Sequence, residues 1–74
     1  MGIRIGQSVE VRQGAGLDSG RQGRVIPRSE VRTDGRGIPL IAGHYCPMRR
    51  DEVAIRDDGG EVFTMFRGCL IVRS

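Results

Sequence analysis

Twelve glycines are spread along this 74-residue chain, and their spacing argues against any fold built on long helices. Inside a helix each glycine costs about 1 kcal/mol relative to alanine, whereas in a turn it supplies backbone angles that other residues adopt with difficulty. The runs between the glycines are rich in valine and isoleucine, which favour strands. We therefore expect an all-β chain with many turns.

Two neighbouring segments predict a hairpin. Residues 52–56 and 61–66 alternate apolar and polar side chains, and the sequence Asp57-Asp58-Gly59-Gly60 between them is typical of a tight turn. Alternation with a period of two places one face of each strand in the core and the other in water. Four further segments are expected to be strands: residues 8–12, 24–26, 38–46 and 69–72.

About a third of the chain resembles the KOW motif. The resemblance runs from Gly6 to Val25 and rests on the sequences Gly6-Gln7-Ser8-Val9-Glu10-Val11 and Gly20-Arg21-Gln22-Gly23-Arg24-Val25, with Gly14 between them. In that family a strand, a glycine-rich loop and a second strand open an SH3-like barrel. The resemblance implies a fold more than a function.

A chain of this length has room for one domain, which we place over residues 1–74. Closing short antiparallel strands into a barrel hides their edges. We therefore predict a small SH3-like barrel of five to six short antiparallel strands. Its core is expected to consist of the strand-patterned apolar residues Val9, Val11, Val25, Ile26, Val53, Ile55, Phe63, Leu70 and Ile71.

The net charge of +3 comes from one stretch of the chain. All 12 basic residues are arginines, and five of them lie within residues 21–36 together with only two acids, which gives that stretch alone +3. Asp34-Gly35 is a turn signal, so this stretch is expected to project from the barrel. Residues 51–61 have the opposite character, because five acids and one arginine give them −4.

The basic stretch is the predicted binding surface, because guanidinium groups match the geometry of phosphate and bind it in a salt-sensitive way. Tyr45 is expected to be the one aromatic outside the core, and it completes the candidate site of Arg21, Arg24, Arg28, Arg32, Arg36 and Tyr45. We favour a small noncatalytic module that binds a protein, with the phosphate backbone of nucleic acid as the alternative ligand. The opposite charges also allow a homo-oligomer, in which the basic stretch meets the acidic hairpin of a second copy.

Catalytic residues, metals and cofactors are not expected. His44 and Cys46 would share one face of a strand, but zinc needs four ligands and the chain has no Cys-x-x-Cys spacing. Cys46 and Cys69 are expected to be free thiols, since two cysteines suit a reducing compartment. No segment approaches the roughly 20 apolar residues of a membrane span, so we expect a cytoplasmic protein without membrane contact.

A remote enzyme alternative rests on a second resemblance. Gly60-Glu61-Val62 followed by Leu70 is similar to the spacing in the last strands of the type II dihydrofolate reductases, which are SH3-like chains that form tetramers. The Val-Gln-Ile-Tyr segment of that family is replaced here by Val62-Phe63-Thr64-Met65. The replacement removes the polar groups that the family uses, so no enzymatic activity is predicted.

Overall fold

The computed structural model describes residues 2–73. It contains seven short strands: β1 (Ser8–Val11), β2 (Gln22–Val25), β3 (Leu40–Ile41), β4 (His44–Tyr45), β5 (Glu52–Asp57), β6 (Val62–Phe66) and β7 (Leu70–Val72). The only helices in the described range are single 3-10 turns over Gly16–Asp18, Arg28–Glu30 and Arg67–Cys69, and none is long and apolar enough to span a membrane. The all-β prediction is confirmed.

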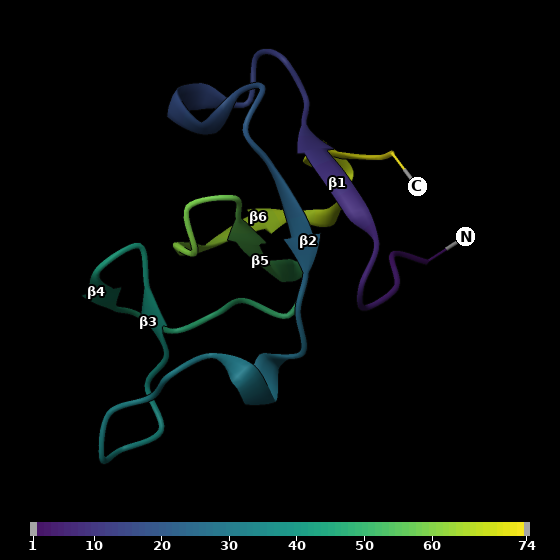
Figure 1. Ribbon diagram of the computed structural model, residues 1–74. Coiled ribbons are helices and arrows are strands. Elements are labelled where there is room, and N and C mark those ends of the chain that lie inside the picture. Colours follow the sequence, from purple (N-terminus) through teal and green to yellow (C-terminus); the bar gives the residue numbers. More distant parts are fainter. Residues whose placement is uncertain (1, 74) are drawn as a thin grey trace.

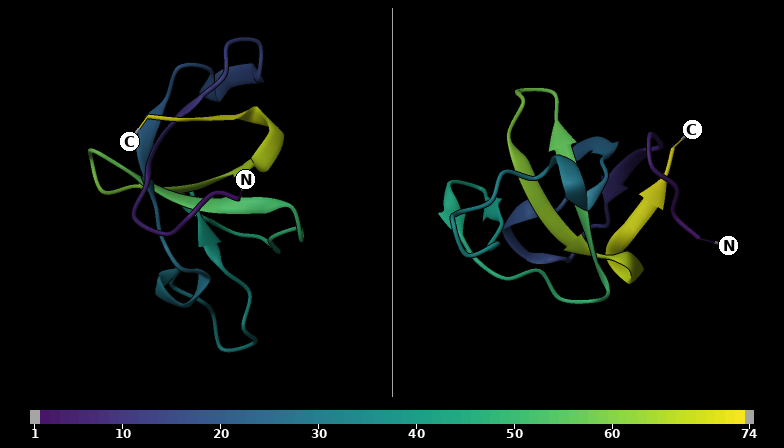
Figure 2. Two further views of the ribbon diagram at one scale, coloured as in Figure 1. Left: turned by 90° about the vertical axis from the view of Figure 1, so that its right-hand side faces the viewer. Right: turned by 90° about the horizontal axis from the view of Figure 1, so that it is seen from below.

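Five of the strands form one antiparallel sheet in the order β6-β5-β2-β1-β7, and β3 and β4 form a separate hairpin (Figure 1). The first and last strands of the chain are therefore neighbours. Figure 2 shows that the strands change direction across the sheet, which wraps it round the core. In the part of the chain that the structure describes, the edge strands β6 and β7 are not paired with each other, so the curved sheet is not a closed barrel.

The strand count exceeds the expected five to six because residues 38–46 are divided in two. Ala42 and Gly43 both have positive φ angles, 49° and 84°, which turn the chain back between β3 and β4. Strand β2 is also longer than expected and begins at Gln22. The predicted hairpin is present as β5 and β6, with Ile55 opposite Phe63 in its register.

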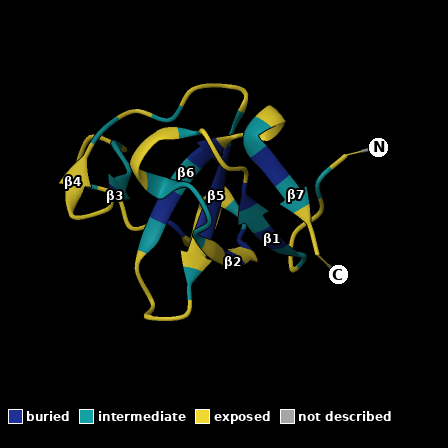
Figure 3. Ribbon diagram, turned by 90° about the horizontal axis from the view of Figure 1, so that it is seen from above, coloured by how far each residue is buried: buried dark blue, intermediate teal, exposed yellow. Residues whose placement is uncertain are grey.

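The main core lies on the inner face of the five-stranded sheet. Figure 3 shows that buried residues follow the strands of this sheet, whereas the loops and β4 are mostly exposed. The cluster consists of Val9, Val11, Val25, Val53, Ile55, Phe63, Met65 and Leu70. Among the predicted core residues only Ile71 is not buried, because it is paired with Glu10 and alternation places it on the face opposite Leu70.

Residues 27–50, which we call the arm, leave the sheet after β2 and return before β5 (Figure 1). A second hydrophobic cluster of Ile26, Val31, Ile41 and Ala54 packs the arm against the outer face of β5. Asp34 closes the far turn of the arm, since its Oδ1 accepts the backbone N–H groups of Arg36 and Ile38. The arm is therefore a folded projection that shares a small hydrophobic cluster with the sheet.

Arg21 covers one end of the main core. Its guanidinium carbon lies 3.9 Å from the centre of the Phe63 ring. The same guanidinium donates to Asp57 at 2.6 Å, to Asp18 at 3.1 Å and to Glu61. The bond to Asp57 raises the pKa of Arg21 above its usual range, and the bond from Arg21 lowers the pKa of Asp57. One side chain thus joins the loop after β1 to both ends of the β5–β6 turn.

Gly23 offers a test of how closely β2 and β5 pack. A Cβ atom at this position would lie 2.5 Å from the Arg56 carbonyl oxygen and 2.7 Å from the Ile55 Cγ2 atom, so the strands would have to separate. We expect Gly23→Ala to reduce the free energy of unfolding by about 1–3 kcal/mol in urea titration. Gly35→Ala is the control, because nothing lies within 4 Å of its added Cβ. Equal midpoints for the two variants would contradict this packing.

The Arg21–Asp57 pair predicts an acid-sensitive stability. Because the pKa of Asp57 is lower in the folded chain, its contribution is complete above the unfolded pKa of about 4 and is lost as the pH falls through the folded value. We expect the melting temperature of Asp57→Asn to fall less than that of the wild type between about pH 6 and about pH 3. Asp58→Asn, which removes a carboxylate outside the ion pairs of residues 2–73, should keep the wild-type pH dependence. Identical profiles for both variants would rule out this role of Asp57.

Candidate nucleic-acid interface

The six predicted site residues do not form one surface. Arg21 is occupied by three acidic partners, so it stabilises the fold and its charge is already neutralised. Two of those partners, Asp57 and Glu61, belong to the acidic hairpin, which the sequence also allows to meet the basic stretch of a second copy. The structure brings the basic and acidic stretches together within one chain at this point.

Arg24 and Arg28 bind neutral backbone carbonyls and so keep their charge. Arg24 Nη1 donates to the Gly6 carbonyl oxygen at 3.0 Å. The Nη2 atom of Arg28 lies 2.9–3.1 Å from three carbonyl oxygens, those of Arg49, Arg50 and Glu52. Arg28 therefore fixes the path of the chain where the arm rejoins β5.

The remaining predicted residues lie on the arm and are exposed. The side chains of Arg32 and Arg36 have no partner within residues 2–73, and Tyr45 on β4 is 53% exposed. Arg32 lines a cleft of about 400 Å³ between the arm and the β5–β6 hairpin. Arg56 of β5 lines the same cleft from the opposite side, although the basic stretch in the sequence did not include it.

The residues that lie outside internal ion pairs carry more positive charge than the chain as a whole. The ion pairs among residues 2–73 use the arginines Arg21 and Arg73 and the acids Glu10, Asp18, Asp57 and Glu61. Of 12 arginines and nine acids, ten arginines and five acids therefore remain outside ion pairs, a balance of +5 against +3 overall. The Arg21 cluster carries the difference of −2, because one arginine is paired there with three acids, and the rest of the surface is basic.

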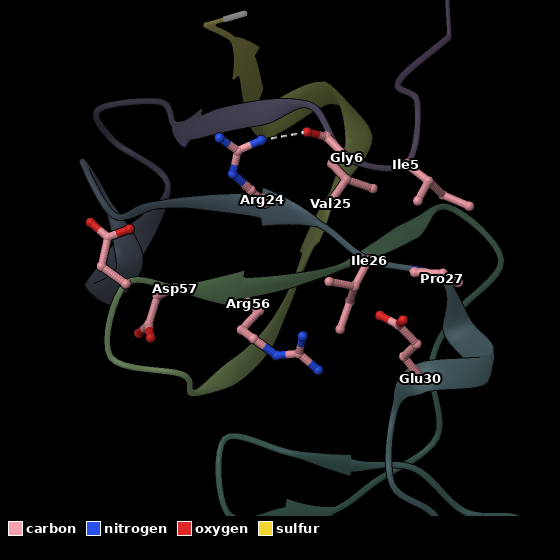
Figure 4. Close-up of a pocket in the computed structure, with 10 residues that line it drawn as sticks. Ile5, Gly6, Arg24, Val25, Ile26, Pro27, Glu30, Arg56 and Asp57 are labelled. Carbon is pink, nitrogen blue, oxygen red and sulfur yellow. Dashed lines mark hydrogen bonds between the residues drawn. The ribbon is translucent and has the colours of Figure 1, made fainter.

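Arg24 and Arg56 face each other directly across β2 and β5. Like charges at opposite positions of an antiparallel pair destabilise a sheet. Figure 4 shows that the two side chains diverge, Arg24 toward Gly6 and Arg56 toward the arm. Arg56 has no side-chain partner in the described part of the chain, so an anion bound beside it would relieve this repulsion.

A groove of about 390 Å³ lies beside this arginine pair (Figure 4). Ile5, Val25, Ile26 and Pro27 form its apolar side. Arg24 and Arg56 on its rim are matched by the carboxylates of Glu30, Asp57 and Asp58. The groove is therefore of mixed charge, and so is the cleft next to Arg32, which Glu30 and Glu61 line together with the two arginines.

Sequence reasoning missed a second basic region around Phe66. The expectation that Tyr45 is the only aromatic outside the core is wrong, because the Phe66 ring is 38% exposed. The Arg49 guanidinium lies 6.0 Å from the centre of this ring, and Arg67 follows it in the chain. The signal was present in the alternation of β6, since buried Phe63 and Met65 put Phe66 on the other face.

His44 and Cys46 do not form a catalytic or metal-binding pair. His44 is exposed on β4, whereas the Cys46 side chain packs against the second hydrophobic cluster. Cys69 packs against the main core, and both cysteines are free thiols. Within residues 2–73 no group of three or more His, Cys, Asp or Glu side chains is placed to hold a metal ion.

Comparisons with known proteins give no relative from which a role could be transferred. No protein-family model matches the chain, and neither a curated protein nor a solved structure is significantly similar to it. The functional argument therefore rests on the chemistry of the surface alone.

Proposed function

We propose that this chain is a noncatalytic module that binds the phosphate backbone of nucleic acid through the exposed arginines of the arm, together with Arg56. The observation that carries the proposal is that the ten arginines outside the ion pairs of residues 2–73 outnumber the five acids outside them, so this part of the surface carries +5. Guanidinium groups without an acidic partner are available to phosphate, and each contact releases condensed counterions from the nucleic acid.

The arrangement of the arm supports this ligand. Arg32 and Arg36 are exposed on a projection that is held against β5 by the second hydrophobic cluster. Arg32 and Arg56 line the two walls of the cleft between the arm and the sheet. Glu30 and Glu61 also line this cleft, and Glu61 is paired with Arg21. A phosphate at the cleft would meet one guanidinium from each wall, and the next phosphates along the backbone would meet the outer arginines of the arm.

A protein ligand is the second candidate, and the groove beside Ile5 favours it. Ile5 is 66% exposed at the edge of an apolar wall, and the rim carries both arginines and carboxylates. Such a surface fits an extended protein segment with both apolar and charged side chains. It does not use the excess positive charge of the molecule, which is why we place it second.

The phosphate proposal is tested by two double variants of equal charge. Arg32→Gln with Arg36→Gln removes two arginines of the arm, and we expect it to weaken binding to every duplex sequence alike. Log affinity falls by about 0.9 per log unit of salt for each duplex phosphate neutralised, so the salt slope should decrease by nearly two. Fluorescence anisotropy with a labelled duplex at roughly 50 and 200 mM salt measures both quantities.

Arg4→Gln with Arg12→Gln is the matched control, because both residues are exposed and lie outside the arm. This control should keep the wild-type slope. Equal loss of binding in the two double variants would mean that net charge alone, and not the arm, attracts the nucleic acid. A wild-type protein that binds neither duplex nor single-stranded nucleic acid at low salt would refute the proposal and leave the protein ligand.

A further inference from the structure

We infer that the exposed ring of Phe66 is a stacking platform for unpaired bases, so that the preferred ligand is single-stranded nucleic acid. The inference rests on the proposed function for its phosphate contacts, and it adds the class of nucleic acid. Phe66 and its neighbours Arg28, Arg49, Arg50 and Arg67 form what we call the Phe66 patch.

The backbone of β6 places the ring at the surface. Phe66 is the last residue of the strand and is paired with Glu52 of β5. Phe63 and Met65 are 2% and 9% exposed on the inner face, whereas Phe66 is 38% exposed on the outer one. The chain has only three aromatic residues, Tyr45, Phe63 and Phe66. One of the three, Phe66, thus lies where it contributes little to the core.

The backbone segments that carry the arginines of the patch are fixed next to Phe66. Arg28 binds the carbonyl oxygens of residues 49, 50 and 52, and the Arg67 backbone N–H donates to the Asp51 carbonyl oxygen at 3.1 Å. These bonds fix the backbone from which Arg49, Arg50 and Arg67 project. The Arg49 guanidinium lies 6.0 Å from the ring centre, the outer limit of a cation–π contact, so it can turn toward a phosphate.

The acids of this region do not cancel its charge. Glu52 is engaged by the Thr64 hydroxyl and by the Arg49 backbone N–H, both at 2.7 Å. Asp51 is exposed and is the one other carboxylate in residues 49–52. Four arginines against these two acids leave the patch at +2, which favours a polyanion next to an aromatic ring.

A duplex cannot use this combination, because its base faces are covered by stacking within the helix. Single strands expose the faces of their bases, and proteins that bind them without sequence preference pair aromatic stacking with a basic track for the backbone. The Phe66 patch has both elements within a few residues. A duplex would contact only its arginines.

The experiment compares a labelled oligothymidine of about 15 nucleotides with a duplex of the same length, by fluorescence anisotropy. Phe66→Leu keeps an apolar side chain but removes the aromatic face. We expect it to weaken oligothymidine binding by roughly tenfold, with an unchanged salt slope and unchanged duplex affinity. A purely structural role would lower both affinities together. If Phe66→Leu bound oligothymidine as tightly as the wild type does, the inference would be overturned.

A second variant keeps the test decisive if Phe66→Leu does not fold. The chain contains no tryptophan, so Phe66→Trp introduces a single tryptophan, whose emission can be excited selectively, at the platform. Its emission should be quenched when oligothymidine is added, and affinity should be retained. Leu17→Trp, at a fully exposed position of the loop after β1, is the control and should show no quenching.

The outcomes separate the inference from the proposed function. If the wild type binds both nucleic acids but Phe66→Trp is not quenched, the inference fails while the phosphate proposal stands. If the wild type binds neither nucleic acid, both fail.

Discussion

The ion-pair cluster around Arg21 determines both the shape of the molecule and the charge that it presents. One guanidinium lies on the Phe63 ring and joins Asp18, Asp57 and Glu61, so it connects two loops that are distant in the sequence. Planar arginine tolerates this position because it stacks on an aromatic face while donating at its edge. The cluster also gathers three acids around one arginine and so carries a net charge of −2 at one place, which leaves the remainder of the molecule basic.

The second constraint is the outer face of β5, where a strand in a small sheet would ordinarily meet water. Ala54 is small enough for the arm to pack onto this face through Ile26, Val31 and Ile41. The arm is also tied to the sheet edge, because the Ala42 N–H donates to the Val62 carbonyl oxygen at 2.7 Å. Together these contacts order the arm, which is largely polar, and so fix the backbone from which Arg32 and Arg36 project.

Local patterns in the sequence predicted the strands well and the site poorly. Alternation identified Val53, Ile55 and Phe63 as core residues, because a period of two depends only on the strand itself. It could not reveal that Arg21 pairs with Asp57, a contact across 36 residues that depends on how β2 meets β5. Charge counted along the chain therefore overstated the role of Arg21 and overlooked Arg56. The resemblance to the KOW motif stays a prediction.

The small contact between the arm and the sheet has a consequence for the local stability of the arm. The arm is attached at its two ends, by the bond from Ala42 to Val62, and through a cluster whose buried members from the arm are only Val31 and Ile41. The sheet is stabilised by the larger core. Local opening therefore requires less free energy in the arm than in β1, β2 and β5, so its backbone amides exchange with solvent first. A surface that opens independently of its scaffold can adjust to a flexible polymer without unfolding the domain.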